Sequence, residues 1–237
     1  MTIAYNGASY FGSQIQKETD QTINGQLEKA LSLLHITTKV QASGRTDRGV
    51  HASRQVVHFD LPPFWSDLPK LKESLTRILP NTIVIRNLYA VPSNFHARYS
   101  AIKRSYRYIL STQEPSPFLA DLVTFVPVLE RDKMREAITL FEGEHNFQYF
   151  KKSGSDTDNF VRTIYKTQIY EHHGFTILTF EANGFLRSQI RLMVGFLLQI
   201  SEGKRTLEDL RQQRNREQQF KIKPAPHQGL YLSNIKY

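Results

Sequence analysis

Apolar positions in the first part of the chain alternate between strand and helix spacing. In the segment 22–34, apolar residues recur at positions 23, 27, 30, 31 and 34, which is the spacing of one helix face. The elements expected here are a strand at 2–5, a helix at 22–34, strands at 39–42 and 55–59, a helix at 68–78 that Pro80 closes, and a strand at 83–90. This β-α-β-β-α-β order predicts a ferredoxin-like unit over residues 1–93.

The second half of the chain repeats the pattern with insertions. The elements expected here are strands at 104–110 and 123–125, a helix with Met134, Ala137, Ile138 and Phe141 that stops at Gly143, strands at 162–170 and 175–181 around the turn His172-His173-Gly174, helices at 185–200 and 207–214, and a last strand at 230–235. We therefore predict a second unit over residues 94–237, in an α+β fold of two tandem ferredoxin-like units.

The composition of the chain restricts the kinds of site and the cellular compartment that we expect for this protein. The sequence has no cysteine, which excludes a disulfide framework and a cysteine-based zinc site. Its longest apolar run, 192–198, is far shorter than the roughly 20 residues that span a bilayer. Because residues 2–5 are already typical of a strand, we expect no signal peptide. We expect a cytoplasmic protein without membrane attachment.

The balance of charge predicts a polyanionic partner. The chain has 31 Lys and Arg against 22 Asp and Glu, a formal charge of +9. Between Arg98 and Gln113 there are four basic residues and no acid, interleaved with Tyr99, Tyr106 and Tyr108, a combination suited to phosphate contact and base stacking. A second basic run, from Lys204 to Lys223, includes several acids, so we interpret it as a solvated helix face and leave it out of the site.

The most informative segment is the polar turn at 42–52, Ala-Ser-Gly-Arg-Thr-Asp-Arg-Gly-Val-His-Ala. It sets one acid, Asp47, between Arg45 and Arg48 and brackets all three with glycines. Two nearby cations favour the ionised carboxylate, as an anion or nucleophile needs. The alternative is a surface ion pair that stiffens the turn. A hydrolase would normally set out a second, protonated acid, so a lone anion favours isomerisation over hydrolysis.

Several motifs along the chain resemble one family. They are the segment from Gly44 to Ala52, Tyr5-Asn6-Gly7, Tyr10-Phe11-Gly12-x-Gln14-x-Gln16, Phe95 to Ser100, Lys103 to Tyr108, Gly143 to Phe147, Asn183-Gly184-Phe185 through Arg191 to Gly195, and Gly229 to Leu232. In this order they are similar to the tRNA pseudouridine synthase A family. The resemblance implies two ferredoxin-like units whose antiparallel sheets join into one continuous sheet, with the active cleft between them.

The resemblance also implies roles for individual residues. Asp47 matches the family's essential aspartate, and Tyr106 matches a tyrosine that stacks on the target base or acts as a base. Arg191 matches an arginine that pairs with that aspartate, and it lies among apolar residues where an unpaired charge would be costly. Tyr108, two residues further on, lies on the same face of the predicted strand and is either a second candidate or a residue that only fills the core.

Further basic residues are candidates for RNA contact. We expect Arg45 to lie near the reacting nucleotide, where it fills the gap left by a flipped-out base. His51 could contact phosphate or only satisfy the turn. The other candidates for RNA binding are Arg48, Arg98, Lys103 and Arg104. Neither a metal nor a cofactor is implied, because the histidines lack ligand spacing and no Gly-x-x-x-x-Gly-Lys segment occurs.

The function implied is isomerisation of uridine to pseudouridine at positions 38 to 40 in the anticodon arm of tRNA, by a homodimer. Arg48, Ser13 and Asn6 depart from the family's usual Ala, Trp and Asp, so we expect an altered tRNA footprint and unaltered chemistry. One alternative is a non-catalytic RNA-binding module of ferredoxin-like fold, which leaves an acid in so basic a turn unexplained. The other is a nucleoside or glycosidic hydrolase, which needs a further acid near Asp47.

Overall fold

The computed structural model describes residues 1–152, 154 and 158–237, and its contacts divide the chain into two compact units. The first consists of Met1–Ile102 with Tyr231–Tyr237, and the second of Lys103–Leu230. This division differs from the expected 1–93 and 94–237, because the last strand joins the first unit. Tyr231 and Leu232 pair with His51 and Ala52, and the Ile102 N–H donates to Lys236 O at 2.9 Å. Apolar spacing cannot reveal which sheet a terminal strand joins.

The first unit has the expected order of helices and strands. Its elements are β1 (Thr2–Tyr5), α1 (Ile23–Ser32), β2 (Gln41–Ala42), β3 (His51–His58), α2 (Leu68–Ile78), β4 (Ile83–Asn87) and β10 (Leu230–Lys236). Strand β3 begins at His51, four residues before the expected start at 55, so the turn that carries Asp47 leads directly into a strand. Helix α1 begins where the Thr22 side chain accepts from the Gly25 N–H.

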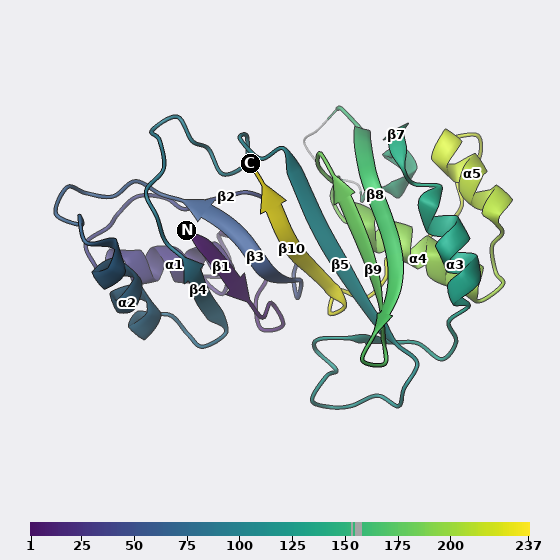
Figure 1. Cartoon of the computed structure of the whole chain (residues 1–237), viewed down its shortest axis with the longest axis horizontal. Coiled ribbons are helices and arrows are strands. Elements are labelled where there is room, and N and C mark those ends of the chain that lie inside the picture. Colours follow the sequence, from purple (N-terminus) through teal and green to yellow (C-terminus); the bar gives the residue numbers. More distant parts are fainter. Residues whose placement is uncertain (153, 155–157) are drawn as a thin grey trace. The chain divides into compact units, whose positions relative to one another are not determined.

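Strands β1 and β3 lie at the centre of the first unit's sheet, and the other strands of this unit pair with one of these two. β1 lies antiparallel to both β3 and β4, and β2 is antiparallel to β3. β10 instead runs parallel to β3, so the expectation of a purely antiparallel sheet is wrong at this strand. Helices α1 and α2 contact each other, and α2 also contacts β4 (Figure 1).

The second unit is a sheet of four antiparallel strands in the order β5-β9-β8-β7, with β6 parallel to β5. Its elements are β5 (Lys103–Ser111), β6 (Thr124–Phe125), α3 (Arg131–Thr139), β7 (Gly143–Asn146), the 3-10 turn η1 (Gln148–Phe150), β8 (Val161–His172), β9 (Phe175–Ala182), α4 (Gln189–Ser201) and α5 (Leu207–Asn215). β7 and η1 were not expected from the sequence.

Helix α4 is shorter than expected at its beginning. It starts at Gln189 rather than near Phe185, because Ser188 has a φ of +57°, a left-handed conformation that a helix cannot include. Residues 183–188 therefore form a loop between β9 and α4. This loop leaves Phe185 available to pack against β5, with consequences for the candidate site.

Buried aromatic rings form the core of the second unit. Phe150 packs edge-on against Phe141 at 5.3 Å between ring centroids and lies 6.1 Å from Phe196. Helix α3 contacts α4 and β8, so the helices cover the sheet as a layer (Figure 1). In the part of the chain that the structure describes, we find no helix with the length and apolar character needed to cross a membrane.

Candidate active site

Asp47 lies in the turn between β2 and β3, and its side chain is half-buried. The Val50 N–H donates to the Asp47 carbonyl at 3.1 Å and closes the turn. Gly49 has a φ of +74°, a conformation that glycine adopts without the strain a side chain brings. The turn therefore holds its one carboxylate residue in a fixed backbone geometry at the beginning of a strand.

The loop that follows β1 supports the turn from one side. Ser13 is buried, its hydroxyl accepts from the Thr46 N–H at 2.9 Å, and its own N–H donates to Thr46 O at 3.0 Å. Thr46 Oγ1 also shares a hydrogen bond with the Tyr5 hydroxyl at 2.8 Å. Gly12 lies so close that a Cβ there would be 2.8 Å from Thr46 O. Ser13, one of the departures from the family pattern, thus lies beneath the residue that precedes Asp47.

A second pair of buried polar residues supports the turn from β3. The Ser43 hydroxyl donates to Gln55 Oε1 at 2.5 Å, and Gln55 Nε2 donates to Gly44 O at 2.7 Å. Both side chains are at most 1% exposed. Because hydrogen bonds between buried groups have defined geometry, the backbone before Asp47 is fixed at two separate points.

The basic neighbours of Asp47 differ in their surroundings. Arg45 and Arg48 are exposed, and the Arg48 guanidinium lies 4.4 Å from the centroid of the Phe11 ring, in cation-π geometry. His51 is 1% exposed, accepts from the Gly7 N–H at 3.0 Å through Nδ1, and stacks on Tyr231 at 4.6 Å. This geometry favours the structural alternative for His51, while Arg45 and Arg48 stay candidates for RNA contact.

In the second unit, Tyr106 and Tyr108 share one face of β5. Tyr106 is 8% exposed and packs against the edge of Phe185 at 5.2 Å between centroids. Tyr108 is fully buried, and its hydroxyl is within hydrogen-bond distance of Thr124 Oγ1 and of Pro226 O. Burial raises the pKa of Tyr108, which keeps its hydroxyl protonated. Tyr108 is therefore a core residue, and Tyr106 remains the candidate tyrosine for contact with the target base.

Arg191 lies in the first turn of α4 and is half-buried. Its Nε donates to Ala225 O at 2.7 Å, while the Ala225 N–H donates to Arg191 O at 2.8 Å. The segment that contains Ala225 packs tightly on α4, because a Cβ at Gly195 would lie 2.2 Å from Lys223 O. These contacts fix the direction of the guanidinium before any substrate binds.

The remaining basic candidates divide by what they contact. The Arg98 guanidinium lies 5.6 Å from the centroid of the Tyr99 ring, which is 76% exposed. Lys103 forms an ion pair with Glu181 at 2.6 Å, and Arg104 Nη1 donates to Asn183 O at 2.9 Å. Arg162, at the beginning of the strand predicted at 162–170, was not among the sequence candidates; burial lowers its pKa, and the charge of Arg104 lowers it further.

The basic run from Lys204 to Lys223 makes many contacts within the second unit. Lys204 pairs with Glu202 at 2.6 Å, and Arg211 with Glu208 at 3.4 Å. Arg205 lies over the Phe220 ring, and Arg214 donates to Leu140 O at 3.0 Å. These contacts agree with the interpretation of a helix face in contact with solvent, whose side chains also bind neighbouring residues of the same unit.

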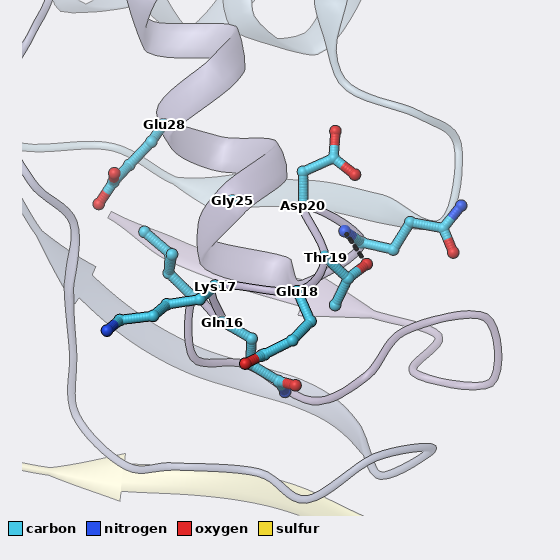
Figure 2. Close-up of a pocket in the computed structure, with 9 residues that line it drawn as sticks. Gln16, Lys17, Glu18, Thr19, Asp20, Gly25 and Glu28 are labelled. Carbon is cyan, nitrogen blue, oxygen red and sulfur yellow. Dashed lines mark hydrogen bonds between the residues drawn. The ribbon is translucent and has the colours of Figure 1, made fainter.

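A surface hollow lies beside α1 in the first unit, as Figure 2 shows. Its lining includes the carboxylates of Glu18, Asp20 and Glu28 and the single cation of Lys17. Glu28 is also engaged, because its Oε1 accepts from the Val40 N–H at 2.9 Å. An excess of carboxylates repels a polyanion, so this hollow is a poor candidate for the nucleic-acid site.

Comparison with known proteins decides between the alternatives. A family model described as tRNA pseudouridine synthase matches residues 1–100 and 137–237. The chain belongs to this family. It is therefore an isomerase, and the alternative of a non-catalytic RNA-binding module is not favoured. Asp47 and Arg191 lie within the matched residues, whereas Tyr106 lies in the stretch between them.

Relatives align over almost the whole chain. A tRNA pseudouridine synthase A of Wolinella succinogenes is 40% identical over 99% of this chain and 92% of its own length. Its counterpart in Geobacillus sp. is 40% identical over 100% of this chain and 96% of its own length. The one in Helicobacter hepaticus is 37% identical over 99% and 97%. A solved Cbf5-Nop10-Gar1 complex aligns at 11% identity over 84% of this chain and 44% of that chain, with a TM-score of 0.39, too low to bear on this chain.

Proposed function

We propose that this pseudouridine synthase acts on the anticodon arm of tRNA, at positions 38 to 40, with Asp47 as its reacting carboxylate. The observation that carries the proposal is the anchoring of the Asp47 turn, in which Thr46 and Gly44 are each hydrogen-bonded to a buried side chain. Catalytic groups act best when surrounding residues lock their position. A surface ion pair would not need such support.

The net reaction explains why one carboxylate suffices. The bond from uracil N1 to ribose C1′ breaks, the base turns, and C5 bonds to C1′. The C5 proton is released and N1 gains a proton, so atoms and charge balance without water, a reductant or an oxidant. An anion at this place can attack the ribose, attack the base or accept a proton, and none of these routes needs a second carboxyl group.

We infer that Arg191 and Tyr106 complete the site. The resemblance assigns them to pairing with the aspartate and to stacking on the base. The contact of Arg191 Nε with Ala225 O supports a guanidinium whose direction is set in advance. The edge contact between Tyr106 and Phe185 likewise supports a Tyr106 ring of fixed orientation, on which a flipped-out base can stack.

We also propose the larger arrangement that the resemblance implies. Both units would be ferredoxin-like, their sheets would join, the cleft between them would contain Asp47, and two copies would form a homodimer. The β4-β1-β3-β2 order of antiparallel strands in the first unit supports this proposal. Sedimentation equilibrium of the purified chain tests the dimer, and a monomer mass at micromolar concentration would contradict it.

Tritium release from tRNA labelled at uracil C5 tests the central claim. Wild-type protein should release tritium, and Asp47→Ala and Asp47→Asn should lower the rate by a factor of about 10⁴ or more, as expected when a reacting group is removed. Affinity for tRNA should change little. Asp132→Asn is the matched control, because this side chain is 95% exposed and lies on α3.

The same assay separates the other functions. Free uracil in the products would indicate a hydrolase, and tRNA binding without release in the wild type would indicate a binding module. Transcripts in which cytidine replaces the uridine at 38, 39 or 40 test the positions. Release that persists when all three are replaced would place the modified uridine elsewhere.

Arg191→Ala tests the proposed pair with Asp47. It should reduce turnover far more than affinity, whereas Arg135→Ala, an exposed helix arginine paired with Asp132, should change neither. In a double-mutant cycle with Asp47→Asn, the two losses should not add, because both substitutions remove the same interaction. Equal losses of turnover and affinity would instead indicate a phosphate contact.

A further inference from the structure

Arg48 and Phe11 form a stacked pair in the first unit, in the turn that carries Asp47 and the loop beside it. The Arg48 guanidinium lies 4.4 Å from the centroid of the Phe11 ring, within the range of a cation-π contact. Both residues are exposed to solvent. Arg48 departs from the family's usual Ala, so the pair is a feature of this chain that the family pattern does not predict.

Backbone contacts bring these two side chains together. The Gly49 N–H donates to Tyr10 O at 3.2 Å, so the residue after Arg48 is joined to the residue before Phe11. A Cβ at Gly12 would lie 3.4 Å from Arg48 N, which shows how closely the loop and the turn approach each other. The two segments are therefore held together without the Arg48 side chain.

The backbone of Phe11 is fixed at both of its polar groups. Its N–H donates to Gln21 O at 2.9 Å, and its carbonyl accepts from Gln16 Nε2 at 2.6 Å. Phe11 is 38% exposed, so the fold presents an aromatic residue to solvent at a defined place. A guanidinium that stacks on such a ring loses part of its freedom to rotate before it meets a ligand, which lowers the cost of binding.

The fold does not neutralise the charge of Arg48. With the residues at 1–152, 154 and 158–237, the Arg48 side chain forms neither an ion pair nor a hydrogen bond. An aromatic ring carries no net charge, and a guanidinium that stacks on it keeps N–H donors at its edge. Arg48 can therefore donate two parallel hydrogen bonds to a phosphate group, which suits its planar fork.

A stacked pair of this kind can also serve the fold alone. In the second unit, the Arg205 guanidinium lies 4.5 Å from the centroid of the Phe220 ring, in a run that includes several acids. Arg48 instead follows Asp47 directly, in a turn whose other charged residue is Arg45. A carboxylate repels RNA phosphates, so a neighbouring cation favours the close approach of the RNA strand that the reaction requires.

We propose that Arg48, held over the Phe11 ring, binds a backbone phosphate of the tRNA beside the nucleotide that reaches Asp47. This proposal deepens the proposed function and rests on it. Phe11 is a positioning residue, because it acts on the RNA through Arg48. An Ala at position 48 cannot make this contact, so Arg48 adds one phosphate to the tRNA footprint of this chain.

The test is the salt dependence of tRNA binding, measured by filter binding between about 50 and 200 mM salt. Arg48→Gln removes the charge, so it should weaken binding and reduce the slope of log affinity against log salt by about one. Phe11→Leu removes the ring and keeps the charge, so it should lower affinity about two- to fivefold at a nearly unchanged slope. Arg205→Gln is the matched control and should retain the wild-type affinity and slope.

A double-mutant cycle tests whether the two residues act together. In the Arg48→Gln background, Phe11→Leu should cost no further affinity, because the ring has no guanidinium left to hold. An equal cost in both backgrounds would mean that Phe11 contacts the RNA by itself, and the proposed pair would be wrong.

Other results would also overturn the proposal. An unchanged slope in Arg48→Gln would exclude a phosphate contact, and a loss of affinity that depends on the identity of one base would indicate base recognition instead. A fall in melting temperature that parallels the loss of affinity would make the pair structural. Failure of the proposed function has a different signature. Wild-type protein would release no tritium from C5-labelled tRNA, while the salt slopes would still separate Arg48→Gln from Arg205→Gln.

Discussion

The turn around Asp47 and the face of β5 around Tyr106 are held in place by different forces. The turn depends on single hydrogen bonds and on glycines, as between Ser13 and Thr46 or Gln55 and Gly44. The β5 face depends on burial of large side chains, as for Tyr108 and Phe180, both fully buried. We therefore expect substitutions in the turn to affect catalysis before stability, and substitutions behind β5 to affect stability before catalysis.

The largest effect in the turn is expected from Gly12→Ala. Gly12 has a φ of +103°, and the added methyl would meet Thr46 O at 2.8 Å, so both the backbone angle and the contact are unfavourable. Gly203→Ala is the matched control, because its φ is +71° with no atom within 4 Å of the added Cβ. We expect Gly203→Ala to cost about 1 kcal/mol of stability without loss of activity.

Gly12→Ala should cost about 2 to 4 kcal/mol and reduce tritium release at least about tenfold in the protein that remains folded, because Thr46 must move and Asp47 moves with it. Thermal unfolding and the release assay measure the two losses. Equal behaviour of the two glycine variants would show that the contact with Thr46 does not position the carboxylate.

Tyr108→Phe tests the other side of the comparison. The substitution removes a hydroxyl that contacts Thr124 Oγ1 and Pro226 O, and it leaves at least one of these acceptors without that partner; Thr124 is buried. We expect a loss of about 1 to 3 kcal/mol in the free energy of unfolding, with activity retained below the melting temperature. Tyr165→Phe, at a tyrosine that is 51% exposed, should change neither. A large loss of turnover at full stability would give Tyr108 a direct role in the reaction.

Ser13→Ala should have a smaller effect on stability and a clear effect on catalysis. The substitution removes the acceptor of the Thr46 N–H and leaves the Ser13 backbone bond to Thr46 O intact. We expect about 1 kcal/mol of destabilisation and a reduction in turnover of about two- to tenfold, with tRNA affinity unchanged. Loss of affinity with normal turnover would place Ser13 in the tRNA footprint, as its departure from the family pattern suggested.

The sequence predicted the Asp47 turn better than its supports. The spacing of charges and glycines in residues 42–52 is local, so one reading of the chain finds it. Ser13 and Gln55 are ordinary polar residues in sequence, and only folding places both against the turn. Tertiary contacts of this kind leave no periodic signal.

The second unit was harder to predict for a similar reason. Its strands at 104–110, 162–170 and 175–181 carry clear apolar patterns and were found close to their observed bounds. β7 was missed because Gly143-Glu144-His145-Asn146 is polar, and its pairing with β8 supplies what its side chains do not. Arg162 and Arg104 are 58 residues apart in the chain, so only the order of strands brings them to the same end of β9.

The smallest expected effect concerns the opposite face of β5, where the ion pair of Lys103 and Glu181 lies. The hydrogen bond from Lys103 lowers the pKa of Glu181 below its ordinary 4.5. A carboxyl whose folded pKa is lowered adds stability above its unfolded pKa, and that stability is lost as pH falls through the folded pKa. Both side chains are 32% exposed, so we expect only about 0.2 to 1 kcal/mol at pH 7.

Lys103→Met should therefore lower the free energy of unfolding by that amount at pH 7. The difference between wild type and variant should shrink as the pH falls below 4.5, because Glu181 then becomes protonated and the ion pair is lost. Urea denaturation of wild type and variant across this pH range measures the difference, and Glu181→Gln should remove the same pH dependence. A difference that persists unchanged to pH 2 would mean that the Lys103 stem stabilises by packing rather than by charge. Loss of tRNA affinity at pH 7 without loss of stability would instead assign Lys103 to RNA contact, and the two faces of β5 would then share that task.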